Sequence, residues 1–257
     1  MSVAELSWET LALAVAGSVL AGFVNTLAGN GSAGTLTVLT DLIGLPPLVA
    51  NGTNRVGTLA AAGTSALTYA RSGSVDWRRG RLLLVAVGAG ALLGGIASTQ
   101  VSNEAFRAVF RYMLVVILAL VFVKPKSWLA ERPGGSSWPA WALGLAGAAV
   151  GFYGGFIQMG FGPLFLALGV LGAGLTLAEA NVYKVIIVAL YTPPLLVAYA
   201  LAGQVDWVVG ALMAAGQAVA AYATTRFAVR SPRAGRVAYG VLVVVVVAAV
   251  ANAIFNF

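Results

Sequence analysis

The first and second halves of this 257-residue chain carry the same short segments in the same order. Gly73-Ser74-Val75-Asp76-Trp77 recurs as Gly203-Gln204-Val205-Asp206-Trp207, and Gly22-Phe23 recurs as Gly151-Phe152. The sequence numbers differ by 130 in the first pair of segments and by 129 in the second. A duplicated half restricts the fold to two units of similar architecture. In membrane proteins such a duplication is typical of transporters that hold a binding site between two structural repeats.

The composition is that of an integral membrane protein. Hydrophobic residues make up 60% of the chain and charged residues 9%, against about 45–50% and about 25% in soluble domains. The 32 glycines suit close packing of membrane helices. Since no long polar stretch is present, we expect one all-α, multi-pass membrane domain, surrounded by the lipid bilayer.

The residue types exclude several functions. The chain contains neither cysteine nor histidine, so disulfides and the commonest metal ligand are excluded, and no metal site or cofactor is expected. Any proton coupling would depend on a carboxylate, a lysine, a tyrosine or the substrate itself. The net charge of +7 comes from basic residues that flank apolar runs, which is typical of cytoplasmic membrane loops and not of nucleic-acid binding.

The apolar runs predict two transmembrane repeats of four to five helical segments each. Runs near the roughly 20 residues that cross a bilayer lie at 10–29, 48–70, 80–101, 106–123, 138–158, 176–201, 206–228 and 235–256. Two shorter pieces, at 34–45 and 162–173, are expected to be half-helices or re-entrant segments. The first repeat is predicted at 1–123, a cytoplasmic linker at 124–138 and the second repeat at 139–257.

Glycines and amides interrupt the helical pattern between the long and short pieces of each half. The two breaks are the segments Asn25–Gly34 and Gly154–Pro163. A broken helix in lipid leaves backbone groups unpaired, so such breaks occur where they face protein or a water-filled cavity. We expect both breaks near the membrane midplane. The alternative is a close helix crossing on small residues.

Lysine and arginine in the loops predict the orientation of the two halves. The positive-inside rule places the basic segments 71–81, 124–132 and 226–236 in the cytoplasm. The loop of Asp206 carries no basic residue and is placed outside, although it repeats the basic loop of Asp76. Equivalent loops then lie on opposite faces of the membrane, so we predict inverted repeats.

Two basic residues lie inside apolar runs instead of at their ends. Arg55 and Lys184 occupy equivalent positions, since their sequence numbers differ by the repeat offset of 129. A cation inside a membrane costs at least about 2.5–3.5 kcal/mol on insertion scales, so the pair is expected to face a central anion. The alternatives are that each cation extends to a membrane interface, or pairs with a carboxylate such as Asp41 or Glu179.

Polar neighbours complete a predicted substrate site for a small anion. Side-chain hydrogen bonds are expected from Asn25, Asn30, Thr53, Asn54, Gln158 and Tyr183, and close backbone approach at Gly31, Gly160 and Gly162. Helix N-termini in the breaks would add N–H groups and positive potential. Asp76 and Asp206 are interpreted as helix caps. No catalytic constellation stands out, so the chain is not expected to be an enzyme.

These residues resemble the sulfite exporter TauE/SafE family of membrane permeases over nearly the whole chain. The motifs that carry the resemblance are Gly22–Gly31, Leu45-Pro46-Pro47, Gly52–Arg55, Tyr69–Trp77, Gly151–Pro163 and Gly203–Trp207. The resemblance implies an inner-membrane exporter of sulfite or organosulfonates, with protons as the candidate coupling ion. Three residues depart from the family pattern: Arg55 replaces a lysine, Tyr183 a small hydroxyl or asparagine, and Gln158 a glycine.

We therefore expect a secondary transporter of small sulfur-containing anions. It would work by alternating access, with the two halves rocking around a midplane site. An anion channel of the same fold, and a membrane sensor or scaffold without transport, are the rival hypotheses. Flux would separate the transporter from the sensor, and saturable counterflow would separate a carrier from a channel.

Overall fold

The computed structural model describes residues 8–27, 31–72, 77, 80–110, 112, 138–231, 237 and 240. Every regular element among these residues is a helix, as the sequence predicts. The elements are α1 (Trp8–Leu27), α2 (Gly31–Thr37), the π-helix η2 (Val38–Leu42), α3 (Pro47–Arg71), α4 (Arg81–Ser98), α7 (Ala140–Phe156), α8 (Phe161–Ala167), the π-helix η3 (Leu168–Gly172), α9 (Leu177–Leu201) and α10 (Trp207–Arg230). The linker predicted at 124–138 lies outside the described residues except for Trp138, as does most of the run predicted at 235–256.

The two halves contain the same succession of elements. In each half a long helix is followed by a seven-residue helix, a five-residue π-helix and a 25-residue helix. The short pieces predicted at 34–45 and 162–173 correspond to α2 with η2 and to α8 with η3. The same order of elements, with matched lengths from the seven-residue helix onward, therefore occurs in both halves.

The difference in sequence number between equivalent residues of the two halves changes at the interruption that follows α1 and α7. Leu27 and Phe156, the last residues of α1 and α7, differ by 129 in sequence number, whereas Pro47 and Leu177, the starts of α3 and α9, differ by 130. One additional residue therefore lies between α7 and α8. The equivalence of Arg55 and Lys184 predicted from an offset of 129 is wrong by one position.

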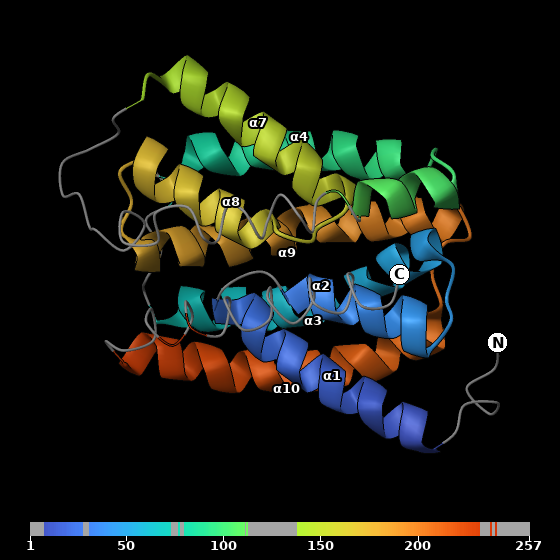
Figure 1. The fold of residues 1–257 in the computed structure, drawn as a ribbon. Coiled ribbons are helices and arrows are strands. Elements are labelled where there is room, and N and C mark those ends of the chain that lie inside the picture. Colours follow the sequence, from blue (N-terminus) through green and yellow to red (C-terminus); the bar gives the residue numbers. More distant parts are fainter. Residues whose placement is uncertain are drawn as a thin grey trace.

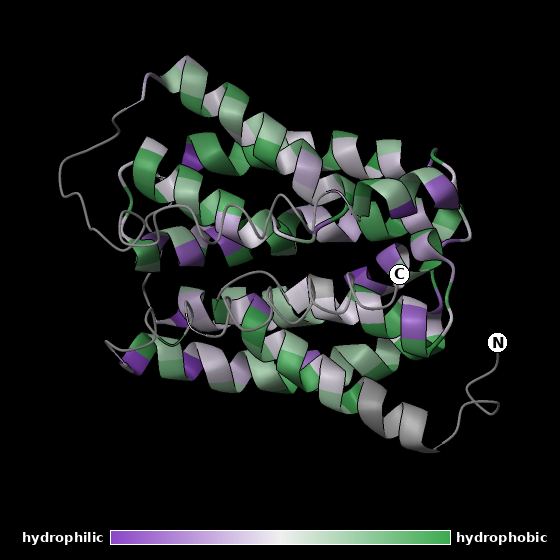
Figure 2. Ribbon diagram, in the orientation of Figure 1, coloured by the Kyte–Doolittle hydropathy of each residue, from purple (hydrophilic) through white to green (hydrophobic). Residues whose placement is uncertain are grey.

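The helices are suited to a bilayer by length and composition. Among the described residues, α4, α9 and α10 are long and apolar enough to cross a membrane. Hydrophobic residues predominate on most of the helices, with hydrophilic ones interspersed (Figure 2). The helix α3 has the same 25 residues as α9 but carries the polar segment Asn51-Gly52-Thr53-Asn54-Arg55 near its start. All five of these residues are buried, so the polarity of α3 is directed into the protein.

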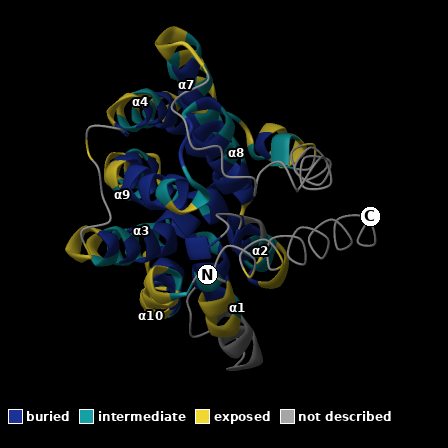
Figure 3. Cartoon of the chain, turned by 90° about the vertical axis from the view of Figure 1, so that its left-hand side faces the viewer, coloured by how far each residue is buried: buried dark blue, intermediate teal, exposed yellow. Residues whose placement is uncertain are grey.

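The halves exchange their fourth helices. Helix α4 of the first half packs against α7 and α9 of the second, and α10 of the second half packs against α1 and α3 of the first. Two layers result, one of α4, α7, α8 and α9 and one of α1, α2, α3 and α10 (Figure 1). Helices α3 and α9 join the layers at the centre, where burial is greatest (Figure 3).

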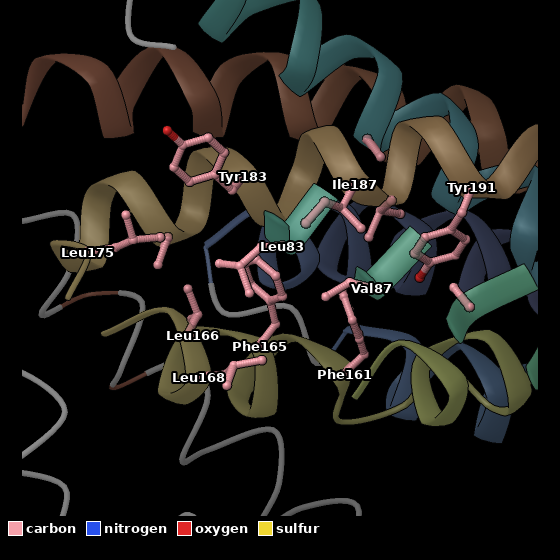
Figure 4. Packing of buried hydrophobic residues seen from close by; sticks show 14 of the residues in the cluster. Leu83, Val87, Phe161, Phe165, Leu166, Leu168, Leu175, Tyr183, Ile187 and Tyr191 are labelled. Carbon is pink, nitrogen blue, oxygen red and sulfur yellow. The ribbon is translucent and has the colours of Figure 1, made fainter. Parts of the chain in front are cut away.

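Apolar side chains and glycines pack the helices within the layer of α4, α7, α8 and α9. Phe161 and Phe165 of α8 pack with Leu83 of α4 and Ile187 of α9 in one buried cluster (Figure 4). Helices α4 and α7 touch backbone to backbone, since a Cβ added at Gly155 would lie 1.8 Å from the carbonyl oxygen of Ala91. Such contact between small residues is how membrane helices gain packing energy without a hydrophobic drive.

Candidate functional site

The break between α7 and α8 has an unusual backbone. Gln158 has φ 61° and Gly160 has φ 75°. Glycine adopts a positive φ freely, but a glutamine there is strained by contact of its Cβ with the backbone. Strain of this kind persists where the surrounding structure holds it and is concentrated at functional sites. Gln158 is 4% exposed, so its amide is held inside the protein.

Lys184 of α9 reaches the opposite break, at the end of α1. Its ammonium donates to the carbonyl oxygens of Asn25 at 3.1 Å and Thr26 at 3.3 Å, and to Oδ1 of Asn181 at 2.6 Å. The last carbonyls of a helix have no partner within the helix and carry partial negative charge. The buried ammonium therefore caps the C-terminal end of α1.

Arg55 of α3 binds the C-terminal end of α7, as Lys184 binds that of α1. Its guanidinium donates to the carbonyl oxygen of Gly155 in the last turn of α7 and lies 5.2 Å from the centre of the Tyr199 ring. Gly155 and Thr26 are equivalent positions, since each directly precedes the last residue of its helix, α7 or α1. Each cation thus comes from the long helix of one half and binds the broken helix of the other.

A cavity of about 30 Å³ lies beside Lys184, which is room for one or two water molecules. Its lining comes from α1, α3, α9 and the second break: Asn25, Thr26, Thr58, Ala61, Ala62, Ser65, Gln158, Phe161, Lys184, Val185 and Val188. Three of the predicted site residues, Asn25, Gln158 and Lys184, meet there. The structure therefore brings residues of both breaks to one point.

Several polar atoms of this cavity have no partner among the described residues. They are Nδ2 of Asn25, Oγ1 of Thr58 and Oε1 of Gln158, all of them buried. Buried polar groups without partners cost about 1–3 kcal/mol each. Three of them around one cavity indicate that a water or a polar ligand completes the site.

The remaining predicted residues lie away from the cavity. Thr53 accepts a hydrogen bond from the Asp206 N–H at 2.8 Å, and Asn54 accepts one from Thr35 at 2.7 Å. Tyr183 belongs to the apolar cluster (Figure 4) and packs on Gly80, where an added Cβ would lie 2.1 Å from its ring. These three residues join helices to one another instead of forming the pocket.

The predicted glycines differ in their roles. A Cβ at Gly31 would lie 2.3 Å from the carbonyl oxygen of Ala21, so α2 approaches α1 closely there. Gly160 supplies the left-handed residue before α8, and Gly162 is buried in its first turn. Asn30 lies outside the described residues. The predicted cap is confirmed at Asp206, which accepts from the N–H groups of Val208 and Val209, while Asp76 is not among the described residues.

Three polar residues of the cavity lining were missed in the sequence, namely Thr26, Thr58 and Ser65. Thr58 and Ser65 line the cavity from α3, and the Ser65 hydroxyl also accepts a hydrogen bond from Thr225 at 3.0 Å. Thr58 lies four positions after Asn54, and Ser65 seven positions after Thr58, which places all three on one face of a helix. That spacing could have predicted both residues from the sequence, although they lie on either side of the apolar segment Ala60-Ala61-Ala62.

A model of one known family matches residues 14–250, and it is described as the sulfite exporter TauE/SafE. The chain belongs to this family. A Sinorhizobium protein described as a probable membrane transporter is 29% identical over 87% of this chain and 85% of its own length. A probable membrane transporter from Haemophilus influenzae is 25% identical over 84% of each chain. The probable membrane transporter YfcA of Escherichia coli K12 is 26% identical over 78% of this chain and 74% of its own. No solved structure gives a significant match.

This TauE/SafE family member is therefore a membrane transporter. The lining of its cavity contains one ammonium group and no carboxylate among the described residues. Nor do those residues contain a group of three acidic side chains, histidines or cysteines that could hold a metal ion. Amide, hydroxyl and ammonium donors around a small space suit a negatively charged ligand.

Proposed function

We propose that this TauE/SafE family member is a secondary transporter that exports a small sulfur-containing anion, such as sulfite or an organosulfonate, across the inner membrane. The observation that carries the proposal is the buried ammonium of Lys184 beside a small cavity that the amides of Asn25 and Gln158 also line. Its acceptors among the described residues are all neutral. A cation in a membrane needs compensating charge, and a bound anion would supply it.

The donor groups of the cavity support the choice of a small oxyanion. At about 30 Å³ the cavity has room for one or two water molecules, so a sulfite or sulfonate group would bind there as the cavity widens. Asn25 offers amide donors, Thr58 a hydroxyl and Lys184 an ammonium group from three different helices. Oxygen atoms that point in several directions, as in sulfite or a sulfonate group, match such a set. The match to the family supports the sulfur chemistry.

The proposed mechanism is alternating access with inverted repeats. It is supported by the antiparallel contact of α3 and α9, in which the start of each helix lies beside the end of the other. The exchange of α4 and α10 supports two rigid layers that rock against each other about this contact. Lys184 is the ionisable side chain of the described lining, so any proton coupling is proposed to involve it or the anion.

Counterflow in proteoliposomes tests the proposal. Radiolabelled sulfite is supplied outside, with excess unlabelled sulfite, sulfoacetate, thiosulfate or acetate trapped inside, at an alkaline pH that keeps sulfite ionised. We expect label to accumulate when a sulfur oxyanion is trapped and not when acetate is. Currents of many ions per opening without counterflow would instead establish a channel. Folded protein without any flux would favour the sensor or scaffold hypothesis.

A further inference from the structure

Gln217 is a polar side chain buried where three membrane helices meet. It belongs to α10, is 0% exposed, and lies against glycines of α1 and α3. A Cβ added at Gly57 would lie 2.3 Å from Nε2 of Gln217, and one added at Gly22 would lie 2.6 Å from its backbone oxygen. Both glycines therefore make room for this residue.

The amide of Gln217 has no hydrogen-bond partner in the part of the chain that the structure describes. Both Nε2 and Oε1 are buried and unpaired. Lipid cannot satisfy such groups, so the unpaired amide lowers the stability of the folded protein. An apolar side chain of similar size would fill the space without that loss.

The other half of the protein shows that packing does not need an amide here. Val87 of α4 is the equivalent of Gln217 at the offset of 130 that relates α3 to α9. A Cβ added at Gly151 would lie 2.1 Å from the backbone oxygen of Val87, which repeats the contact of Gly22 with Gln217. Val87 is fully buried in the apolar cluster. The same position thus carries an apolar residue in one layer and an unpaired amide in the other.

The amide lies next to the residues that line the cavity. Gly57 directly precedes Thr58, and Gly22 lies one turn before Thr26, whose hydroxyl donates to the Gly22 carbonyl oxygen at 2.8 Å. Thr26 and Thr58 both line the cavity, and the hydroxyl of Thr58 is unpaired as well. The unpaired amide therefore lies behind both of these lining segments.

We propose that Gln217 is a further binding residue of the transport site, whose amide N–H groups bind the anion when it moves between α1, α3 and α10. This inference rests on the proposed function. Since Gly57 has no side chain, nothing on that residue separates the amide from the α3 face that carries Thr58. Position 217 carries an amide, whereas the equivalent position 87 carries a valine. The anion path therefore passes an amide in the layer of α1, α3 and α10 and has no equivalent amide in the other layer.

Single cysteines in this naturally cysteine-free chain test the inference. The variants Gln217→Cys and Val87→Cys are treated in proteoliposomes with a small hydrophilic thiol reagent, with and without methanesulfonate, which does not consume the reagent. We expect Q217C to be modified and protected by methanesulfonate, and V87C to stay unmodified. Equal inertness of both cysteines, or labelling of Q217C that methanesulfonate leaves unchanged, would overturn the inference.

A second variant keeps the test informative if a cysteine disturbs folding. Gln217→Met preserves the length of the side chain without the amide. We expect about a ten-fold or larger rise in the half-saturation concentration for transport, the effect of losing a hydrogen bond to a charged ligand. Thermal stability should be unchanged or higher. An unchanged half-saturation concentration would reject the role of Gln217, whereas absence of transport in the unaltered protein would reject the proposed function instead.

Discussion

The side-chain amide of Asn51 donates a hydrogen bond of 2.8 Å to the hydroxyl of Tyr199, which joins the start of α3 to the end of α9. The opposite end of the same helix pair carries the reciprocal bond, from Asn181 to Tyr69 at 3.3 Å. Asn181 and Tyr199 are the equivalents of Asn51 and Tyr69 at the offset of 130. The central contact between the halves is therefore closed by one Asn–Tyr pair at each end.

The two tyrosines should differ in their contribution to stability. The hydroxyl of Tyr199 also bonds to Ser98, so Tyr199→Phe leaves Asn51 and Ser98 each without this partner, whereas Tyr69→Phe affects Asn181. We expect Y199F to lower the free energy of unfolding by about 1–3 kcal/mol, and Y69F by less. Denaturant unfolding of both variants in detergent measures this. Equal losses would contradict the view that the Tyr199 end is the more strongly bonded.

The charge of Lys184 should be essential for transport. Lys184→Gln keeps N–H donors for the carbonyls of Asn25 and Thr26 but removes the positive charge. We expect transport to fall at least about ten-fold, because hydrogen bonds between charged groups contribute about 1.5–3 kcal/mol. Arg81→Gln is the matched control, since it removes an exposed cation from the start of α4. Sulfite flux in K184Q equal to that of R81Q would rule out Lys184 as an anion ligand.

The contact of α4 with α7 should tolerate no side chain at Gly155. In Gly155→Ala the new Cβ would lie 1.8 Å from the Ala91 carbonyl oxygen, and the backbone shift would also move the carbonyl that Arg55 binds. Overpacking of this kind typically costs about 1–3 kcal/mol. Gly88→Ala is the control in the same helix pair, because nothing lies within 4 Å of its added Cβ. The melting temperatures in detergent should separate G155A from G88A, and similar values would contradict the predicted clash.

Much of the fold follows from local patterns in the sequence. Long apolar runs predict the long helices, and the glycines and amides between them predict the interruptions before α2 and α8. The cap at Asp206 follows from an Asp placed before an apolar run. These features are determined by residues close together in the sequence, so they can be predicted from one sequence alone.

The candidate site was harder to predict because it depends on helix phase and register. Thr53 and Thr58 are five positions apart, so they point in different directions and only Thr58 reaches the cavity. Tyr183 precedes Lys184 by one position and faces the apolar cluster for the same reason. The change of offset from 129 to 130 among the short motifs indicates an inserted residue but does not show that it lies directly after α7.

Gln158, the strained residue of the second break, should lower the stability of the protein while contributing to transport. Gln158→Gly relaxes a backbone at φ 61° and removes an amide that lines the cavity. We expect the free energy of unfolding to rise by about 1 kcal/mol, while transport falls. Gln158→Ala is the matched variant, because it loses the amide but keeps the strain, so its transport should fall without a gain in stability. If Q158G and Q158A are equally stable, the backbone of Gln158 is not strained.

Equivalent helix ends should be reached from opposite sides of the membrane. Ser72 and Ala202 directly follow α3 and α9, are exposed, and are equivalent at the offset of 130. Each helix has 25 residues, about 37 Å of length, which is enough to cross a hydrocarbon layer of about 30 Å. Since Arg71 adjoins Ser72, the positive-inside rule places that end in the cytoplasm. An impermeant thiol reagent added to intact cells should therefore label Ala202→Cys, and label Ser72→Cys only after permeabilisation. Labelling of both from the same side would exclude inverted repeats and the rocking mechanism that depends on them.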